Sequence, residues 1–91
     1  MSSYETSRLA FTPDAADPDK WWAIDENNVE YCIHPAWDSD LWTCFAQRRV
    51  AFDSTTQALG NFAEFEEAAE ACDAFDPVEA GLLGGSRFVQ F

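Results

Sequence analysis

Positively charged residues are scarce in this chain. Its 91 residues include five Lys and Arg against 17 Asp and Glu, which gives a formal net charge of -12. A negative charge of this size repels phosphate backbones and anionic lipid surfaces. The composition therefore argues against direct binding of nucleic acid or of a membrane, both of which rely on clustered Lys and Arg.

Long apolar runs and paired cysteines are also missing. No apolar stretch approaches the roughly 20 residues that cross a bilayer, and the first residues, MSSYETSRLAF, lack the basic start and apolar core of a secretory signal. The three cysteines, Cys32, Cys44 and Cys72, form no CxxC motif, which favours reduced, buried thiols. We therefore expect a cytoplasmic protein.

Side chains that carry catalysis or bind metals are few. His34 is the only histidine, no Ser or Cys has a credible base beside it, and Gly84 and Gly85 precede no helix that could hold a phosphate. A zinc site would have to be built from Cys32, His34, Cys44 and Cys72, whose spacing matches no usual zinc motif. We expect no enzymatic activity, no metal and no cofactor.

Core-forming residues, in contrast, are plentiful. Hydrophobic residues make up 47% of the chain and aromatic residues 15%, which is too much for a disordered acidic tail. A chain of this length holds one modest core. We expect a single domain over residues 1–91.

Several segments have the pattern of strands. KWWAID and VEYCIHP flank the polar connection ENN, which predicts a hairpin with Val29, Tyr31 and Ile33 on one face of its second strand. LWTCFAQRRVAFD predicts either one long strand or a second hairpin that turns near Gln47 and Arg48. STTQALG is a short strand or an extended connection, and RFVQF a candidate terminal edge strand.

One helix is predicted at about residues 62–75. Asn61 is its candidate N-cap, and Pro77 follows its end. One apolar stripe runs along it, formed by Phe65, Ala68, Ala69, Cys72 and Phe75. The expected fold is α+β, with a small antiparallel sheet of three to five strands packed against this main helix.

The opposite face of the predicted helix carries acidic residues and no Lys or Arg. From Val50 to Ser86 the chain has eight acidic residues and no Lys or Arg. Repulsion between carboxylates three or four residues apart costs about 0.2 to 0.5 kcal/mol a pair, and Asp73 and Asp76 oppose the helix dipole. A solvated surface is the simple interpretation of this face. A surface that binds a cationic partner is the alternative, because one Lys would have relieved much of the repulsion.

In size, charge and its FAEFEEAAEACDAF segment, the chain resembles the small acidic inhibitors of bacterial defence encoded by phages and mobile elements. Some of these anti-CRISPR and anti-restriction proteins imitate nucleic acid. The resemblance implies that the target is a nucleic-acid-binding host complex, such as a CRISPR effector. This chain is richer in Trp and Phe than a pure charge mimic needs, which leaves room for a protein contact of another kind.

Four tryptophans lie within 22 residues. Trp21 and Trp22 are adjacent, so they cannot both point inward from one strand. Trp37 lies in the loop AWDSD, where Asp38 and Asp40 would surround it. Because Trp is enriched at the energetic centres of interfaces, Trp37 is a candidate surface anchor.

We therefore expect an inhibitor that binds a basic, nucleic-acid-binding surface of a host protein complex. The candidate partner-binding residues are Glu66, Glu67, Glu70, Asp73, Asp76, Trp37, Asp38 and Asp40. Reversing the charge of Glu70 and Asp73 to Lys should abolish inhibition and leave the fold intact or slightly more stable. Two other interpretations stay open, namely an acidic accessory domain from a high-salt organism and a small module that forms a homodimer.

Overall fold

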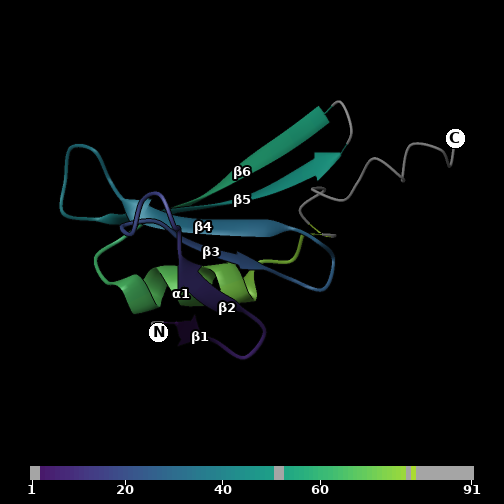
Figure 1. Cartoon of the computed structure of the whole chain (residues 1–91), viewed down its shortest axis with the longest axis horizontal. Helices are drawn as coiled ribbons and strands as arrows, with labels where there is room; N and C mark the ends of the chain where they lie inside the picture. The colour runs from purple at the N-terminus through teal and green to yellow at the C-terminus, as the bar shows by residue number, and fades with distance from the viewer. Residues whose placement is uncertain (1–2, 51–52, 78, 80–91) are drawn as a thin grey trace, which may run out of the picture.

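In the part of the chain that the structure describes, six antiparallel strands form one sheet, and a short helix crosses one of its faces (Figure 1). The computed structural model describes residues 3–50, 53–77 and 79. The strands are β1 (Tyr4–Glu5), β2 (Ala10–Pro13), β3 (Trp21–Ile24), β4 (Glu30–Pro35), β5 (Trp42–Val50) and β6 (Asp53–Phe62). Their order across the sheet is their order along the chain, so each pairs with its neighbours in sequence.

The expected fold, three to five strands against one main helix, is wrong. The described chain is mostly sheet, with six strands and a helix of ten residues, α1 (Phe65–Ala74). Two strands account for the error in number. β1 has only two residues, and β6 has ten residues without a regular alternation of apolar and polar side chains.

The helix is shorter than predicted because β6 continues to Phe62, which pairs with Trp42. Asn61 is therefore not the N-cap, and its side-chain Oδ1 instead accepts a hydrogen bond of 2.7 Å from Thr43 on β5. Glu64 is the N-cap, and its backbone N–H donates to Glu67 Oε1 at 3.2 Å. The N-cap therefore lies three residues later than predicted.

β5 is one long strand, so the alternative of a hairpin turning near Gln47 and Arg48 is wrong. Both residues pair with β6, at Thr56 and Thr55 respectively. STTQALG belongs to β6, whereas RFVQF lies outside the described residues. The register shifts between Cys44 and Phe45, where β6 has one extra residue.

The core lies between the sheet and α1. Val29, just before β4, and Tyr31 and Ile33 of β4 share one face, as the alternation predicted, and all three are buried. The helix contributes its apolar stripe, with Ala68, Ala69 and Cys72 fully buried. Phe65 packs at the centre of an aromatic group, with edge-on contacts to Tyr4, Phe11, Trp21 and Trp42.

The two tryptophans at the start of β3 point to opposite faces, as expected. Trp21 contacts Phe65 on the helix side, whereas Trp22 contacts Phe45 on the other face of the sheet. We call this second face the outer face, because α1 does not cover it. On β5, Cys44 lies on the helix side and Phe45 on the outer face.

Candidate binding surface

The topology collects acidic residues at one end of the sheet. Because neighbouring strands are antiparallel, the β2–β3 loop (14–20), the β4–β5 loop (36–41) and the first turn of the helix (64–67) lie at the same end. These segments contribute three, two and three carboxylates, and Lys20 is their only base. We call these three segments the acidic end.

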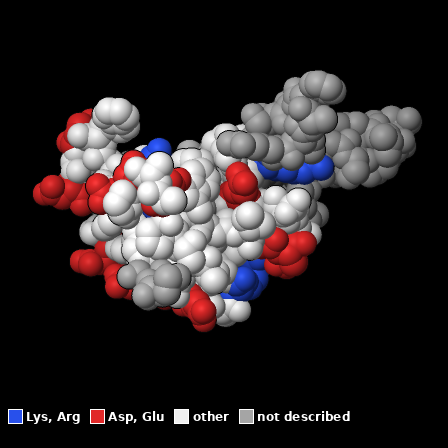
Figure 2. All heavy atoms as spheres, in the orientation of Figure 1, with Lys and Arg blue, Asp and Glu red and all other residues white. Residues whose placement is uncertain are grey.

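The space-filling view agrees with this placement. Figure 2 shows several red patches at the left-hand end of the molecule, where Figure 1 places these loops; other red patches lie at the centre and the right, where most of the blue surface also lies. The eight carboxylates of the acidic end are Asp14, Asp17, Asp19, Asp38, Asp40, Glu64, Glu66 and Glu67. Charge on this molecule is thus unevenly distributed along its length.

Trp37 stands out from the acidic end. Its side chain is 98% exposed, the largest such value among the described large hydrophobic residues. Asp38 and Asp40 follow it in the same loop, and both are exposed. The loop is closed at its base by a hydrogen bond of 2.9 Å from Ala36 N–H to Leu41 O. An indole held in water by a closed acidic loop is suited to contact another molecule.

The predicted helix residues divide between the two ends of the molecule. Glu66 and Glu67 are exposed in the first turn and belong to the acidic end. Glu70 is exposed one turn further on. Asp73 and Asp76 lie beyond it at the opposite end, where Asp76 Oδ1 accepts a hydrogen bond of 3.2 Å from the Glu79 N–H.

Asp73 has partners within the protein. Its Oδ1 accepts hydrogen bonds from Thr6 Oγ1 at 2.6 Å and from the Arg8 N–H at 2.9 Å, and its Oδ2 accepts one from Ser7 Oγ at 2.9 Å. The hydrogen bond from Thr6, together with those from Ser7 and Arg8, lowers the pKa of Asp73. Asp73 thus joins the first hairpin to the helix, and its reversal to Lys would disturb the fold.

The last turn of the helix has no basic residue of its own, and Arg8 brings a positive charge to it. Its guanidinium donates to the carbonyl oxygens of Asp73, at 2.7 and 2.9 Å, and of Cys72 and Phe75, at 3.3 Å. These carbonyls form the negative end of the helix dipole. The repulsion that the sequence predicts at this end of α1 is therefore partly compensated from the β1–β2 connection.

A buried carboxylate lies behind Arg8. The Asp25 side chain is 0% exposed and lies 3.9 Å from Arg8 Nη1. Its oxygens accept hydrogen bonds from the N–H groups of Asn27 and Val29 and from Tyr31 Oη. Burial, with the hydrogen bond to Asp25, raises the pKa of Tyr31. Asp25 therefore orders the β3–β4 turn.

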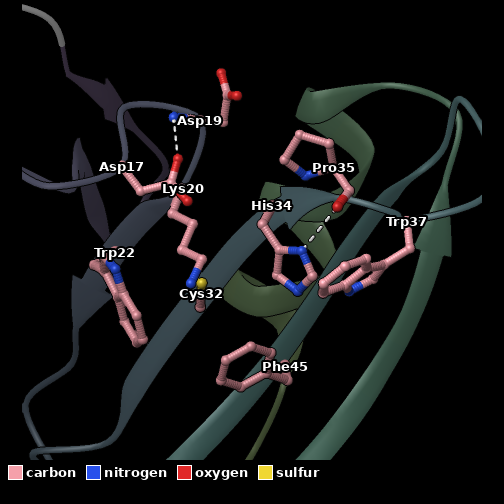
Figure 3. A pocket seen from close by; sticks show the side chains of 9 residues that line it. All are labelled: Asp17, Asp19, Lys20, Trp22, Cys32, His34, Pro35, Trp37 and Phe45. Atoms are coloured by element: carbon pink, nitrogen blue, oxygen red, sulfur yellow. Dashed lines mark hydrogen bonds between the residues drawn. The ribbon is translucent and has the colours of Figure 1, made fainter.

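A groove of about 480 Å³ opens on the outer face, next to the acidic end (Figure 3). Its lining comes from the β2–β3 loop, β3, β4, the β4–β5 loop and β5. The lining residues are Asp17, Asp19, Lys20, Trp22, Cys32, His34, Pro35, Trp37 and Phe45. Trp37 thus belongs both to the acidic end and to this groove.

Two aromatic residues of the groove lining, Trp22 and Phe45, are held in place by contacts with their neighbours. Trp22 Nε1 donates to Asp14 Oδ2 at 2.9 Å, and the Trp22 and Phe45 rings meet edge-on at 6.1 Å between centroids. The His34 ring also meets the Phe45 ring edge-on, at 6.0 Å between centroids. Its Nδ1 lies 2.9 Å from Pro35 O, to which a protonated Nδ1 donates (Figure 3).

The cysteines do not share a site. Cys32 and His34 lie on the outer face, whereas Cys44 and Cys72 meet between the sheet and the helix. These four residues therefore cannot hold one metal ion together. Burial raises the pKa of Cys32 to about 12, and the hydrogen bond to Cys44, with burial, raises that of Cys72. Both thiols remain protonated and unreactive at neutral pH.

The groove and the Arg8 contacts were not found from the sequence. The groove depends on cross-strand pairs, Trp22 with Cys32 and Cys32 with Phe45, which only the register fixes. The alternation of VEYCIHP did place Cys32 and His34 on one face. No local signal connects Arg8 to a helix 65 residues later.

Comparison with known proteins gives no identification, because no protein-family model, curated protein or solved structure matches this chain. Among the described residues, no helix has the length and apolar character needed to cross a membrane. A functional conclusion therefore depends on the surface itself.

Proposed function

We propose that this protein binds a basic surface of a partner protein through the acidic end, and that it acts as an inhibitor by competing with nucleic acid for that surface. One observation carries the proposal. The topology brings eight carboxylates and one lysine to the end of the molecule where Trp37 is 98% exposed.

Electrostatics and desolvation both favour a basic partner. Carboxylates gathered at one end repel each other, and a cationic surface would relieve this repulsion and speed association. A fully exposed indole gains from burial in an interface, where Trp commonly contributes most to affinity. Charge complementarity around an aromatic anchor is the pattern expected of such a contact.

The structure refines which predicted residues the proposal uses. Trp37, Asp38 and Asp40 form its centre, and Glu66 and Glu67 flank them in the first helical turn. Glu70 extends the surface along the helix. Asp73 and Asp76 lie at the opposite end, and we assign Asp73 a role in holding the first hairpin to the helix.

The proposed setting is the cytoplasm of a bacterial cell, and the proposed partner is a nucleic-acid-binding defence complex, such as a CRISPR effector. The support is the resemblance of this small acidic chain to anti-CRISPR and anti-restriction inhibitors. Inhibition would be steric and electrostatic, since the acidic end would occupy the surface that nucleic acid otherwise contacts.

Capture from bacterial lysate with identification by mass spectrometry tests this proposal. The wild-type protein should retain a nucleic-acid-binding protein at about 50 mM salt and release it at about 500 mM, because screening weakens contacts between exposed charges. Added nucleic acid should compete. The double variant Asp38→Lys/Asp40→Lys should lose the partner.

The matched control is Glu5→Lys/Glu79→Lys, which makes the same change in net charge with exposed residues outside the acidic end. It should retain the partner. Equal loss in both variants would show that net charge alone matters, and capture unchanged across the salt range would contradict an electrostatic interface. Circular dichroism of both variants checks the fold.

The exposed edge of β6 favours a second candidate function, a module that forms a homodimer. β6 is ten residues long and lies last in the described sheet, with no described strand on its outer side. Such an edge can pair with a second copy. Light scattering of the free protein across a range of concentrations distinguishes a dimer from a monomer.

A further inference from the structure

The groove on the outer face combines aromatic walls with acidic residues at its rim. Trp22 and Trp37 stand on opposite sides of it, with Phe45 below them (Figure 3). Asp17 and Asp19 lie at the rim, on the β2–β3 loop, with the Asp19 carboxylate pointing away from the groove in this view. The Asp17 carboxylate would repel an anionic ligand, and a neutral apolar ligand would form no ion pair with it.

The loop that holds the rim is ordered before any ligand arrives. Asp14 Oδ1 accepts hydrogen bonds from the N–H groups of Ala16, at 2.7 Å, and Asp17, at 3.3 Å. Asp17 Oδ1 accepts one from the Asp19 N–H at 3.2 Å. A site built in this way loses less conformational entropy when it binds.

His34 adds a hydrogen-bond acceptor to the lining. When its Nδ1–H donates to Pro35 O, the neutral ring keeps Nε2 as an acceptor. The groove then offers aromatic faces, carboxylates and an imidazole nitrogen, and all of these suit a ligand with many N–H donors. A guanidinium group is planar, stacks on aromatic rings and donates five N–H groups, so it fits this set better than an ammonium does.

The groove already contains one cationic side chain. Lys20 extends into it, with its ammonium towards Cys32 (Figure 3). The half-buried Lys20 has a flexible stem and can swing out to solvent. Lys20 would therefore compete with any cation that enters the groove.

We propose that this groove binds an arginine side chain of the partner, with its guanidinium between the aromatic walls and paired to Asp17. The inference rests on the proposed function, because a basic partner surface is the source of the arginine. It assigns the outer face next to the acidic end as the part of the interface that selects arginine over other residues.

A peptide titration tests the groove without the partner. The probes are acetyl-Gly-Arg-Gly-amide and the same peptide with citrulline, which has a similar shape but no charge. The arginine peptide should cause saturable shifts of the Trp22 and Trp37 indole N–H resonances at low salt. The citrulline peptide should bind at least about threefold more weakly, since it lacks the cation–π attraction and the ion pair.

Substitutions of the lining residues should change the affinity for the arginine peptide in opposite directions. Trp37→Ala and Asp17→Asn should each weaken binding of the arginine peptide about threefold. Lys20→Gln should tighten it by a similar factor, because the competing ammonium group is removed. Ile24→Ala, at an exposed apolar residue outside both the groove lining and the acidic end, is the control and should change nothing.

Three results would overturn the proposal: absence of saturable shifts with the arginine peptide, equal binding of the citrulline peptide, or weaker binding in Lys20→Gln. The last result would mean that Lys20 itself holds the ligand. If the arginine peptide does not bind but Asp38→Lys/Asp40→Lys still loses the partner, the arginine site is rejected and the proposed function stands. If the arginine peptide binds but the protein captures no partner in a salt-sensitive way, the arginine site stands and the proposed function is rejected.

Discussion

At the scale of single residues, Arg8 and Asp73 join the first hairpin to the helix. Arg8 caps the last carbonyls of the helix from the first hairpin, and Asp73 accepts three hydrogen bonds from that hairpin. The acidic helix is therefore not left uncompensated at its C-terminal end. In its N-terminal turn, where the dipole favours carboxylates, Glu66 and Glu67 are exposed.

Asp73→Asn should reveal this role through its pH dependence. The pKa of Asp73 in the folded protein lies below its ordinary value of 3.8, so its charge stabilises the fold at higher pH and this contribution disappears as pH falls through the folded pKa. At neutral pH the variant should lose about 1 to 2 kcal/mol of unfolding free energy, through its weakened hydrogen bonds.

Urea unfolding from pH 7 to pH 2 measures the difference between the two proteins. It should stay constant down to about pH 5 and shrink below about pH 4. Asp40→Asn, in an exposed loop, is the control and should cost less than about 0.5 kcal/mol at neutral pH. A difference that is as large at pH 2 as at pH 7 would contradict the assigned role.

At the scale of elements, β6 pairs with β5 and leads into the helix, and its backbone conformation depends on Gly60. Gly60 has φ +126°, a conformation that other residues rarely adopt, and it lies next to the register shift between β5 and β6. An added Cβ would meet the Phe62 ring at an ordinary distance of 3.5 Å. The backbone conformation alone therefore explains glycine at this position.

Gly60→Ala should destabilise the fold by about 1 to 3 kcal/mol, the usual range for a residue held in a strained backbone conformation. Thermal unfolding, followed by circular dichroism, measures the effect. Thr56→Ala, at an exposed position of the same strand, is the matched control and should have a small effect. Equal stability of the two variants would show that the strand relaxes at residue 60.

The elements differ in how far the sequence could predict them. Alternation in VEYCIHP placed Val29, Tyr31 and Ile33 on one face, and the predicted stripe in α1 contains the buried residues of the helix. β6 was uncertain because its residues do not alternate, and the helix boundary was wrong because pairing of Phe62 with Trp42 overrides the N-cap preference of Asn61. The groove requires the sheet register, which hydrophobic pattern alone does not supply.

At the scale of the whole molecule, the net charge of -12 opposes folding through self-repulsion. Raising the salt concentration from about 10 to 500 mM shortens the Debye length and should raise the melting temperature by about 4 to 8 °C, which corresponds to about 1 kcal/mol. Differential scanning calorimetry measures this. Asp38→Lys/Asp40→Lys should respond less to salt, because part of the repulsion is already removed.

The same measurement addresses the interpretation of an accessory domain from a high-salt organism. A chain adapted to concentrated salt should be unfolded at about 10 mM, whereas an inhibitor from an ordinary bacterium should remain folded there and gain only a few degrees. A melting temperature that does not change with salt would contradict the role assigned to self-repulsion.

The pairing of each strand with its neighbours in sequence also bears on how the chain folds. Five successive hairpin contacts need only short loops to close, so most of the sheet can form through local encounters. The contacts of Arg8 with Asp73, 65 residues apart, are among the most distant in the chain. We expect them to form after the main folding barrier, so that they act as a latch that slows the opening of the molecule more than they speed its assembly.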